Sequence, residues 1–173
     1  LISTDFIITN GEGYKNLQSD STFRSGFGLT LHPMENLTAR LYYDFSTKVN
    51  TQSSMAAFIS YTAKNFTVGA EYNKQFHVNF TDSRDMSGTS FYATLRAGKK
   101  LKVFARYDQL LSNTINGAEF DWNHGKDGEL YIAGIEYAPV NGVKFSPNYQ
   151  GWNPADTTRS LVSSFYLNCE IKF

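Results

Sequence analysis

The segment SLVSSFYLNCEIKF, residues 160–173, decides the fold, because apolar and polar side chains alternate along it with a period of two. One face carries Leu161, Ser163, Phe165, Leu167, Cys169, Ile171 and Phe173. The other face carries Ser164, Tyr166, Asn168, Glu170 and Lys172. Successive side chains of a strand point to opposite faces of a sheet, so this pattern predicts a β-strand with one oily and one wet face.

The same alternation recurs in nine further segments and does not change to the 3.6-residue period of a helix. These segments are 2–8, 23–32, 37–45, 57–64, 66–73, 91–97, 101–108, 131–137 and 143–150. The 14 Phe and 11 Tyr, with only 4 Pro, favour strands as well, because aromatic rings suit a pleated surface. The sequence therefore predicts an all-β protein of about ten strands in a single domain, residues 1–173.

The connections between these segments alternate in length. Short connections are expected near 32–36, 64–65, 98–100 and 139–142, the last of which contains the hairpin signal Asn141-Gly142. Long polar connections are expected at about 10–21, 47–53, 78–88, 112–128 and 151–159. This alternation is typical of an antiparallel up-and-down transmembrane β-barrel, with tight periplasmic turns and larger outer loops. On that assignment, Phe173 lies at the periplasmic rim.

The composition argues against several other classes of protein. Sixteen Lys and Arg balance 16 Asp and Glu, so no basic field is available to attract nucleic acid. The mean hydropathy is −0.38, and no apolar run approaches the ~20 residues of a membrane helix. A barrel wall places apolar residues at alternate positions, so this low value is compatible with a membrane barrel. The single cysteine, Cys169, is expected to be a small apolar residue of the wall.

Periodicity alone does not separate a membrane barrel from a soluble ligand-binding barrel of the lipocalin type, whose apolar face points inward. Two observations favour the membrane. The apolar segments run for about ten residues, which lets a tilted strand cross a bilayer. Large rings also fall near the ends of the apolar faces, where they would form interfacial girdles. These rings belong to Tyr43, Phe45, Tyr61, Tyr72, Tyr107, Tyr137, Tyr149 and Phe173.

Five segments resemble a porin-like outer-membrane family of Bacteroidetes-type bacteria, similar to phosphate-selective porins. They are NGEGYKNLQ (10–18), VFARYD (103–108), KDGELYIAGIEYAP (126–139), GVKFSPNYQGWNPAD (142–156) and SSFYLNCEIKF (163–173). The resemblance implies a channel in the bacterial outer membrane for passive diffusion of small hydrophilic solutes or ions. Family members have about sixteen or more strands after a signal peptide, so the chain matches the C-terminal portion of such a porin.

The start of the chain bears on how the barrel closes. Residues 1–5 lack the basic and apolar regions of a signal peptide, so the chain is expected to be a mature product or a fragment. Ten strands with both termini on the periplasmic side either close by themselves or form part of a larger barrel. A ten-stranded barrel would be largely filled by side chains, whereas a larger one would keep an aqueous channel.

A channel needs a hydrated wall, and the charged residues of the wet faces are the candidates to line it. They are Arg24, Arg40, Asp44, Glu71, Arg96, Arg106, Asp108, Glu136, Lys144, Glu170 and Lys172. With Asp5, Lys64 and Lys102 added, cations slightly outnumber anions, which predicts a weak preference for anions. The alternative is that these charges pair across neighbouring strands and only satisfy one another. Arg106 and Asp108 in particular are either a solute-facing pair or a brace of the wall.

No motif predicts a catalytic residue, a metal site or a cofactor. Asp121, Asn123, Asp127 and Glu129 could offer oxygens to Ca²⁺, but their spacing differs from an EF-hand, so a solvated loop is expected. An outer-membrane enzyme or a non-channel anchor stays open as an alternative, because scattered Asp, His and Ser residues could converge. The expected partners are outer-membrane lipid and small hydrophilic solutes. A homo-oligomer is also compatible, since porin trimers are common.

Overall fold

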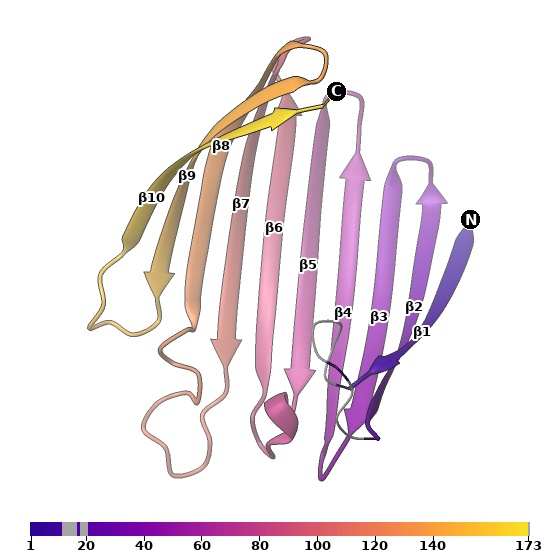
Figure 1. The fold of residues 1–173 in the computed structure, drawn as a ribbon, viewed down its shortest axis with the longest axis vertical. Helices are drawn as coiled ribbons and strands as arrows, with labels where there is room; N and C mark the ends of the chain where they lie inside the picture. Colours follow the sequence, from indigo (N-terminus) through magenta and orange to yellow (C-terminus); the bar gives the residue numbers. More distant parts are fainter. Residues whose placement is uncertain (12–16, 18–20, 173) are drawn as a thin grey trace.

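The computed structural model describes residues 1–11, 17 and 21–172, and these residues form one ten-stranded antiparallel sheet (Figure 1). The strands are β1 (Ile2–Asn10), β2 (Phe23–Met34), β3 (Leu37–Thr47), β4 (Thr51–Thr62), β5 (Phe66–Phe76), β6 (Met86–Arg96), β7 (Leu101–Ser112), β8 (Gly128–Val140), β9 (Val143–Pro154) and β10 (Val162–Ile171). A 3-10 turn, η1 (Val78–Phe80), follows β5. Every strand pairs with its neighbours in sequence, which confirms the predicted up-and-down order. Phe173 and most of segment 10–18 lie outside the described residues.

The register keeps the two kinds of side chain on separate faces. Ala93 of β6 pairs with Ala105 of β7, and Ala105 pairs with Ala133 of β8, so the apolar positions of adjacent strands lie side by side. On the opposite face, Lys102 of β7 pairs with Glu136 of β8. A shift of one residue would exchange the faces, so the alternating sequence itself fixes this pairing.

The sheet is curved but not closed. β1 and β10 both bend toward the same side of the sheet, which gives an open trough (Figure 1). Among the described residues, β1 pairs only with β2 and β10 only with β9. The predicted ten strands are therefore confirmed, whereas a closed ten-stranded barrel is not observed, and two edges carry unpaired backbone groups.

Burial in this sheet is the reverse of that in a soluble domain. Along β4, the apolar positions Met55, Ile59 and Tyr61 are exposed, whereas the opposite positions are partly sheltered. Within the described ranges, the only buried hydrophobic residue is Val78, which lies in a loop. The buried polar residues are Asp44, Ser46, Gln52, Ser112, Asp127 and Asn148. The sheet thus shelters its polar face and exposes its apolar face.

The turns confirm part of the predicted connection pattern. Gly142 has a φ of 81° and closes the predicted two-residue hairpin between Val140 and Val143. The amide of His32 donates to the Leu1 carbonyl (2.9 Å) and that of Lys172 to the Gly142 carbonyl (2.8 Å). Both ends of the described chain therefore lie at the short-turn end of the sheet, as Figure 1 also shows.

The strict alternation of long and short connections was a wrong prediction. Residues 47–53 were expected to be a long loop, but only 48–50 separate β3 from β4. Similarly, β9 continues to Pro154, inside the predicted loop 151–159, and β6 begins at Met86, inside 78–88. The backbone ladder extends beyond the apolar positions because Ser, Thr, Gln and Asn side chains also fit an extended strand.

None of the helices in the described part of the chain has the length and apolar character needed to cross a membrane.

Candidate functional site

The polar face of the sheet is the candidate site, and the strand register gathers all the predicted charged residues on it. These are Arg24, Arg40, Asp44, Glu71, Arg96, Arg106, Asp108, Glu136, Lys144 and Glu170, while Lys172 follows β10 and contacts Glu170. The register therefore puts these positions on one face of the sheet.

Four strands at one side of the trough carry a continuous ladder of charges. Lys102 Nζ lies 2.8 Å from Glu136 Oε1, and Glu136 Oε2 lies 3.8 Å from Lys144 Nζ. Lys144 in turn lies 3.5 Å from Glu170, which contacts Lys172 at 2.8 Å. Alternating signs along the ladder leave each charge next to an opposite one, so these residues largely neutralise one another.

The other side of the trough has a two-pronged ion pair that joins the edge strand to the sheet. Arg40 of β3 donates to both carboxylate oxygens of Asp5 in β1, at 2.8 and 2.9 Å, and also to Thr30 Oγ1 at 2.7 Å. The pair passes over Gly28 of β2, where a side chain would overlap both partners. Glycine at this position is what allows charges on non-adjacent strands to meet.

The centre of the polar face contains a smaller brace. Arg106 Nε donates to both oxygens of Asp108 at 2.8 Å, and Ser90 Oγ donates to the same carboxylate. The geometry matches the wall-brace interpretation of this pair, because both members are satisfied within the wall. Asn73 Nδ2 likewise donates to Glu71 Oε1.

Arg96 differs from the other arginines of the predicted wall. Nothing in the described ranges forms an ion pair with it, and it lines a hollow of about 300 Å³ at the short-turn end, together with Lys64 and Lys102. The pairing alternative thus describes most of the wall, and the surplus of positive charge is confined to this end.

The exposed apolar face has an ordered boundary near the long loops. Tyr107 and Tyr131 lie with ring centroids 5.3 Å apart, and their hydroxyls donate to the two oxygens of Glu129 at 3.0 and 2.5 Å. Asn153 contributes a further, longer hydrogen bond to Glu129. The tyrosine rings lie on the apolar face, and their hydroxyls bond to a carboxylate at the long-loop end of the same face. This arrangement is found where a surface passes from hydrocarbon to water.

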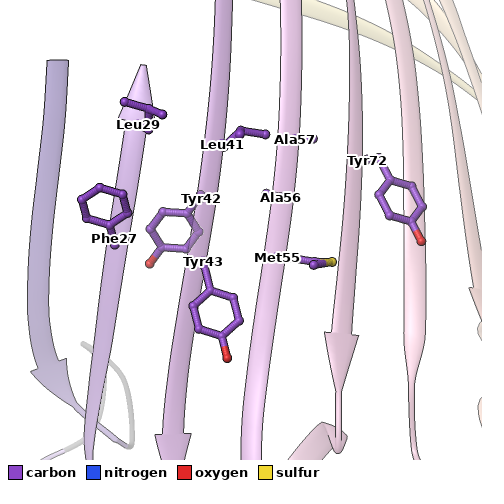
Figure 2. A pocket seen from close by; sticks show the side chains of 9 residues that line it. All are labelled: Phe27, Leu29, Leu41, Tyr42, Tyr43, Met55, Ala56, Ala57 and Tyr72. Carbon is purple, nitrogen blue, oxygen red and sulfur yellow. The ribbon is translucent and has the colours of Figure 1, made fainter. Parts of the chain in front are cut away.

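The same face is hollowed rather than flat. A shallow depression of about 320 Å³ lies over β2 to β5. Figure 2 shows the larger side chains that line it, Phe27, Tyr43 and Tyr72, together with the smaller Ala57. A second depression of about 650 Å³ lies over β5 to β9, where Ala93, Ala105 and Ala133 lie beside aromatic rings. Cys169 also belongs to this face, opposite Phe145, and is exposed, in agreement with its predicted place in the wall.

The long loops are anchored at their bases by a buried carboxylate and by a hydrogen bond between two loops. Asp127 is 1 % exposed and accepts hydrogen bonds from the Ser112 amide and hydroxyl and from Asn123 Nδ2. Trp122 Nε1 donates to the Asp85 carbonyl at 2.8 Å, which ties the β7–β8 loop to the β5–β6 loop. The β7–β8 loop is therefore fixed at its base by Asp127 and Trp122, while residues 113–120 are largely exposed, in agreement with the predicted solvated loop.

The possible calcium ligands of this loop do not converge. Asp121 accepts from the Thr114 hydroxyl, Asp127 faces Ser112 and Asn123, and Glu129 faces the tyrosines. Among the described residues, no group of three or more His, Cys, Asp and Glu side chains could hold a metal ion.

No family model, no curated protein and no solved structure matches the chain. The porin-like resemblance of the sequence therefore stays a prediction.

Sequence reasoning named no aromatic residue of the polar face as a functional candidate. Tyr42, Phe58, Tyr92 and Phe104 occupy positions between the charged residues, on the side that the alternation assigns to polar groups. A Cβ at Gly26 would meet the Tyr42 hydroxyl, and one at Gly134 would meet the tip of the Phe104 ring, both at 2.5 Å. Glycines at polar-face positions are thus the signal that could have revealed these rings.

Proposed function

We propose that this chain forms the wall of a porin-like outer-membrane channel through which small hydrophilic solutes diffuse passively. The observation that carries the proposal is the reversed burial of the sheet. Ile59 is 50 % exposed and Phe165 82 % exposed on the apolar face, while Asp44 and Asn148 are buried on the polar face. Water would penalise such an apolar surface, whereas lipid would cover it without cost.

The open edges support the same conclusion and define what the full channel requires. Backbone groups in hydrocarbon must be satisfied within the protein, so a sheet that spans a bilayer has to close. β1 and β10 run in opposite directions, so an up-and-down barrel can close either by pairing these two edges directly or by adding an even number of strands between them. In the described sheet the two edges are not paired with each other. We therefore assign this sheet to a larger barrel of a bacterial outer membrane, with the apolar face toward lipid.

The two alternatives from the sequence fit the geometry less well. A soluble lipocalin-like barrel would bury the apolar face, which is the exposed one in this sheet. A non-channel anchor would need an interior filled by mutually satisfied charges, and the ion ladders provide part of such a filling. Conductance separates the channel from the anchor.

The test is incorporation of the full-length protein into planar lipid bilayers. Discrete, ohmic current steps are expected, with ion selectivity read from the reversal potential in a salt gradient. A correctly folded, detergent-purified protein that produces no current would overturn the channel proposal. A protein that stays folded and monomeric in plain buffer would overturn the lipid-facing assignment as well.

A further inference from the structure

We propose that the inner wall binds pyranose sugars along a diagonal row of four aromatic rings, Tyr42, Phe58, Tyr92 and Phe104. This inference rests on the proposed channel and names its solute class. The residues come from β3, β4, β6 and β7 and share the polar face of the trough. We refer to them below as the aromatic row.

The register makes the row continuous. Tyr42 pairs with Ala56, so Phe58 lies two residues further toward the short-turn end of β4. The rings of Phe58 and Tyr92 lie nearly parallel, with centroids 6.5 Å apart and an interplanar angle of 18°. Tyr92 pairs with Arg106, so Phe104 lies one step nearer the short turns on β7. Each step thus descends from the long-loop end toward the short-turn end of the wall.

Glycines allow the rings to lie along the wall. Gly69 of β5 pairs with Tyr92 on one side and with Ser60, two residues after Phe58, on the other, and a side chain there would overlap the Tyr92 ring. Gly26 and Gly134 leave similar space beside Tyr42 and Phe104. Rings held in this way offer their faces to the interior, and a ring face attracts the partly positive C–H groups on the flat side of a sugar.

A hollow of mixed character opens at the long-loop end of the row. It has a volume of about 440 Å³, and Met86 and Leu110 line it together with Tyr42 and the polar residues Asp44, Ser54, Asn73 and Gln75. A carboxylate, a hydroxyl and two amides are donors and acceptors suited to sugar hydroxyls. Asp44 Oδ1 has no hydrogen-bond donor among the described residues, with Arg24 Nε at 3.5 Å.

The charges that flank the row favour a neutral solute over an ion. Arg40 is bound to Asp5, and Arg106 to Asp108, so the cations beside Phe58 and Tyr92 are already neutralised. Polar groups that are paired in this way still accept and donate hydrogen bonds at their edges. A neutral polyhydroxyl ring is the class of solute that uses both stacking and such contacts.

The experiment measures block of the single-channel current of the full-length protein by maltohexaose, with poly(ethylene glycol) of similar size as the ring-free control. Concentration-dependent block by the sugar alone is expected. Phe58→Ala and Tyr92→Ala should each weaken the block about 2- to 10-fold, since a stacked aromatic contact contributes on the order of 0.5–1.5 kcal/mol. Tyr92→Phe keeps the ring and should keep the block.

Phe91→Ala is the matched control, because Phe91 neighbours Tyr92 in sequence but lies on the apolar face. Equal block by both polymers, or an equal effect of Phe91→Ala and Tyr92→Ala, would overturn the sugar assignment. Open-channel current without any sugar block would do the same while leaving the channel proposal intact. Loss of all current would instead remove the channel on which the inference rests.

Discussion

The ring of Tyr92 occupies the space that a Cβ at Gly69 would fill on the neighbouring strand. The two residues are paired across β5 and β6, so the contact is local to one rung of the sheet. This contact links the backbone of the wall to the placement of the aromatic row. The same position therefore offers a test of how tightly the inner wall is packed.

Gly69→Ala is expected to lower the free energy of unfolding by about 1–3 kcal/mol, because the added methyl displaces the Tyr92 ring. Gly88→Ala is the matched control on the same face, where the nearest atom to a Cβ is the Gln109 carbonyl oxygen at an ordinary 3.7 Å. Urea unfolding in detergent micelles, followed by tryptophan fluorescence, measures both variants. Equal stabilities for the two would contradict the overlap.

The sequence predicted the wall of this protein better than its rims. Alternation fixes the faces because a one-residue slip would move every apolar side chain to the wrong side, so the charged residues were placed correctly. Connection lengths were less predictable, since the polar residues after Thr47 and before Pro154 can extend a strand or leave it. The loop rim depends on contacts such as Trp122 with Asp85, which are 37 residues apart and leave no periodic signal.

The buried carboxylate of the rim gives a second prediction. Asp127→Ala removes the acceptor for the Ser112 amide and hydroxyl and for Asn123, which leaves buried donors unsatisfied at a cost of about 1–3 kcal/mol. Proteases should therefore cleave the β7–β8 loop faster in the variant than in the natural protein. Asp121→Ala, which removes the acceptor for the Thr114 hydroxyl at an exposed site, should change the cleavage rate much less. Cleavage of both variants at the same rate would contradict the proposed anchor.

The ion pair between β1 and β3 gives a third prediction. Arg40→Leu leaves Asp5 without its bidentate donor, so β1 should exchange its amide hydrogens faster than before. Both side chains are more than one-third exposed, so solvent screens the pair and the expected change is modest, a few-fold in exchange rate. Arg96→Leu, at an arginine of the same face without an ion pair in the described structure, is the control and should leave β1 unchanged. Unaltered exchange in β1 of Arg40→Leu would show that backbone pairing with β2 alone holds this edge.

Asp156, in the loop before β10, gives a prediction for pH. Hydrogen bonds from the Thr158 hydroxyl and amide hold the pKa of Asp156 below its ordinary value of 3.8. A carboxyl with a lowered pKa stabilises the folded loop above the ordinary pKa, and this contribution is lost as the pH falls through the lowered value. Amide exchange at Thr158 should therefore rise at acidic pH, after correction for intrinsic rates. Thr158→Val removes the hydroxyl donor and should move the transition to higher pH; an unchanged midpoint would rule out the hydroxyl as its cause.

The lipid-facing assignment has its sharpest test at Ile59, which is half exposed on the apolar face of β4. In a protein surrounded by water, a lysine at an exposed position is close to neutral in stability. In a barrel wall it would sit in hydrocarbon, where a lysine near the bilayer midplane costs about 2–4 kcal/mol. Ile59→Lys is therefore expected to lower the free energy of unfolding in lipid vesicles by up to this amount, because Ile59 lies two residues from Tyr61 of the predicted interfacial girdle. Ser60→Lys, at the next residue and on the polar face, should cost much less because its side chain points away from lipid. If Ile59→Lys folds as stably as the natural protein while Ser60→Lys does not, the two faces have been assigned the wrong way round.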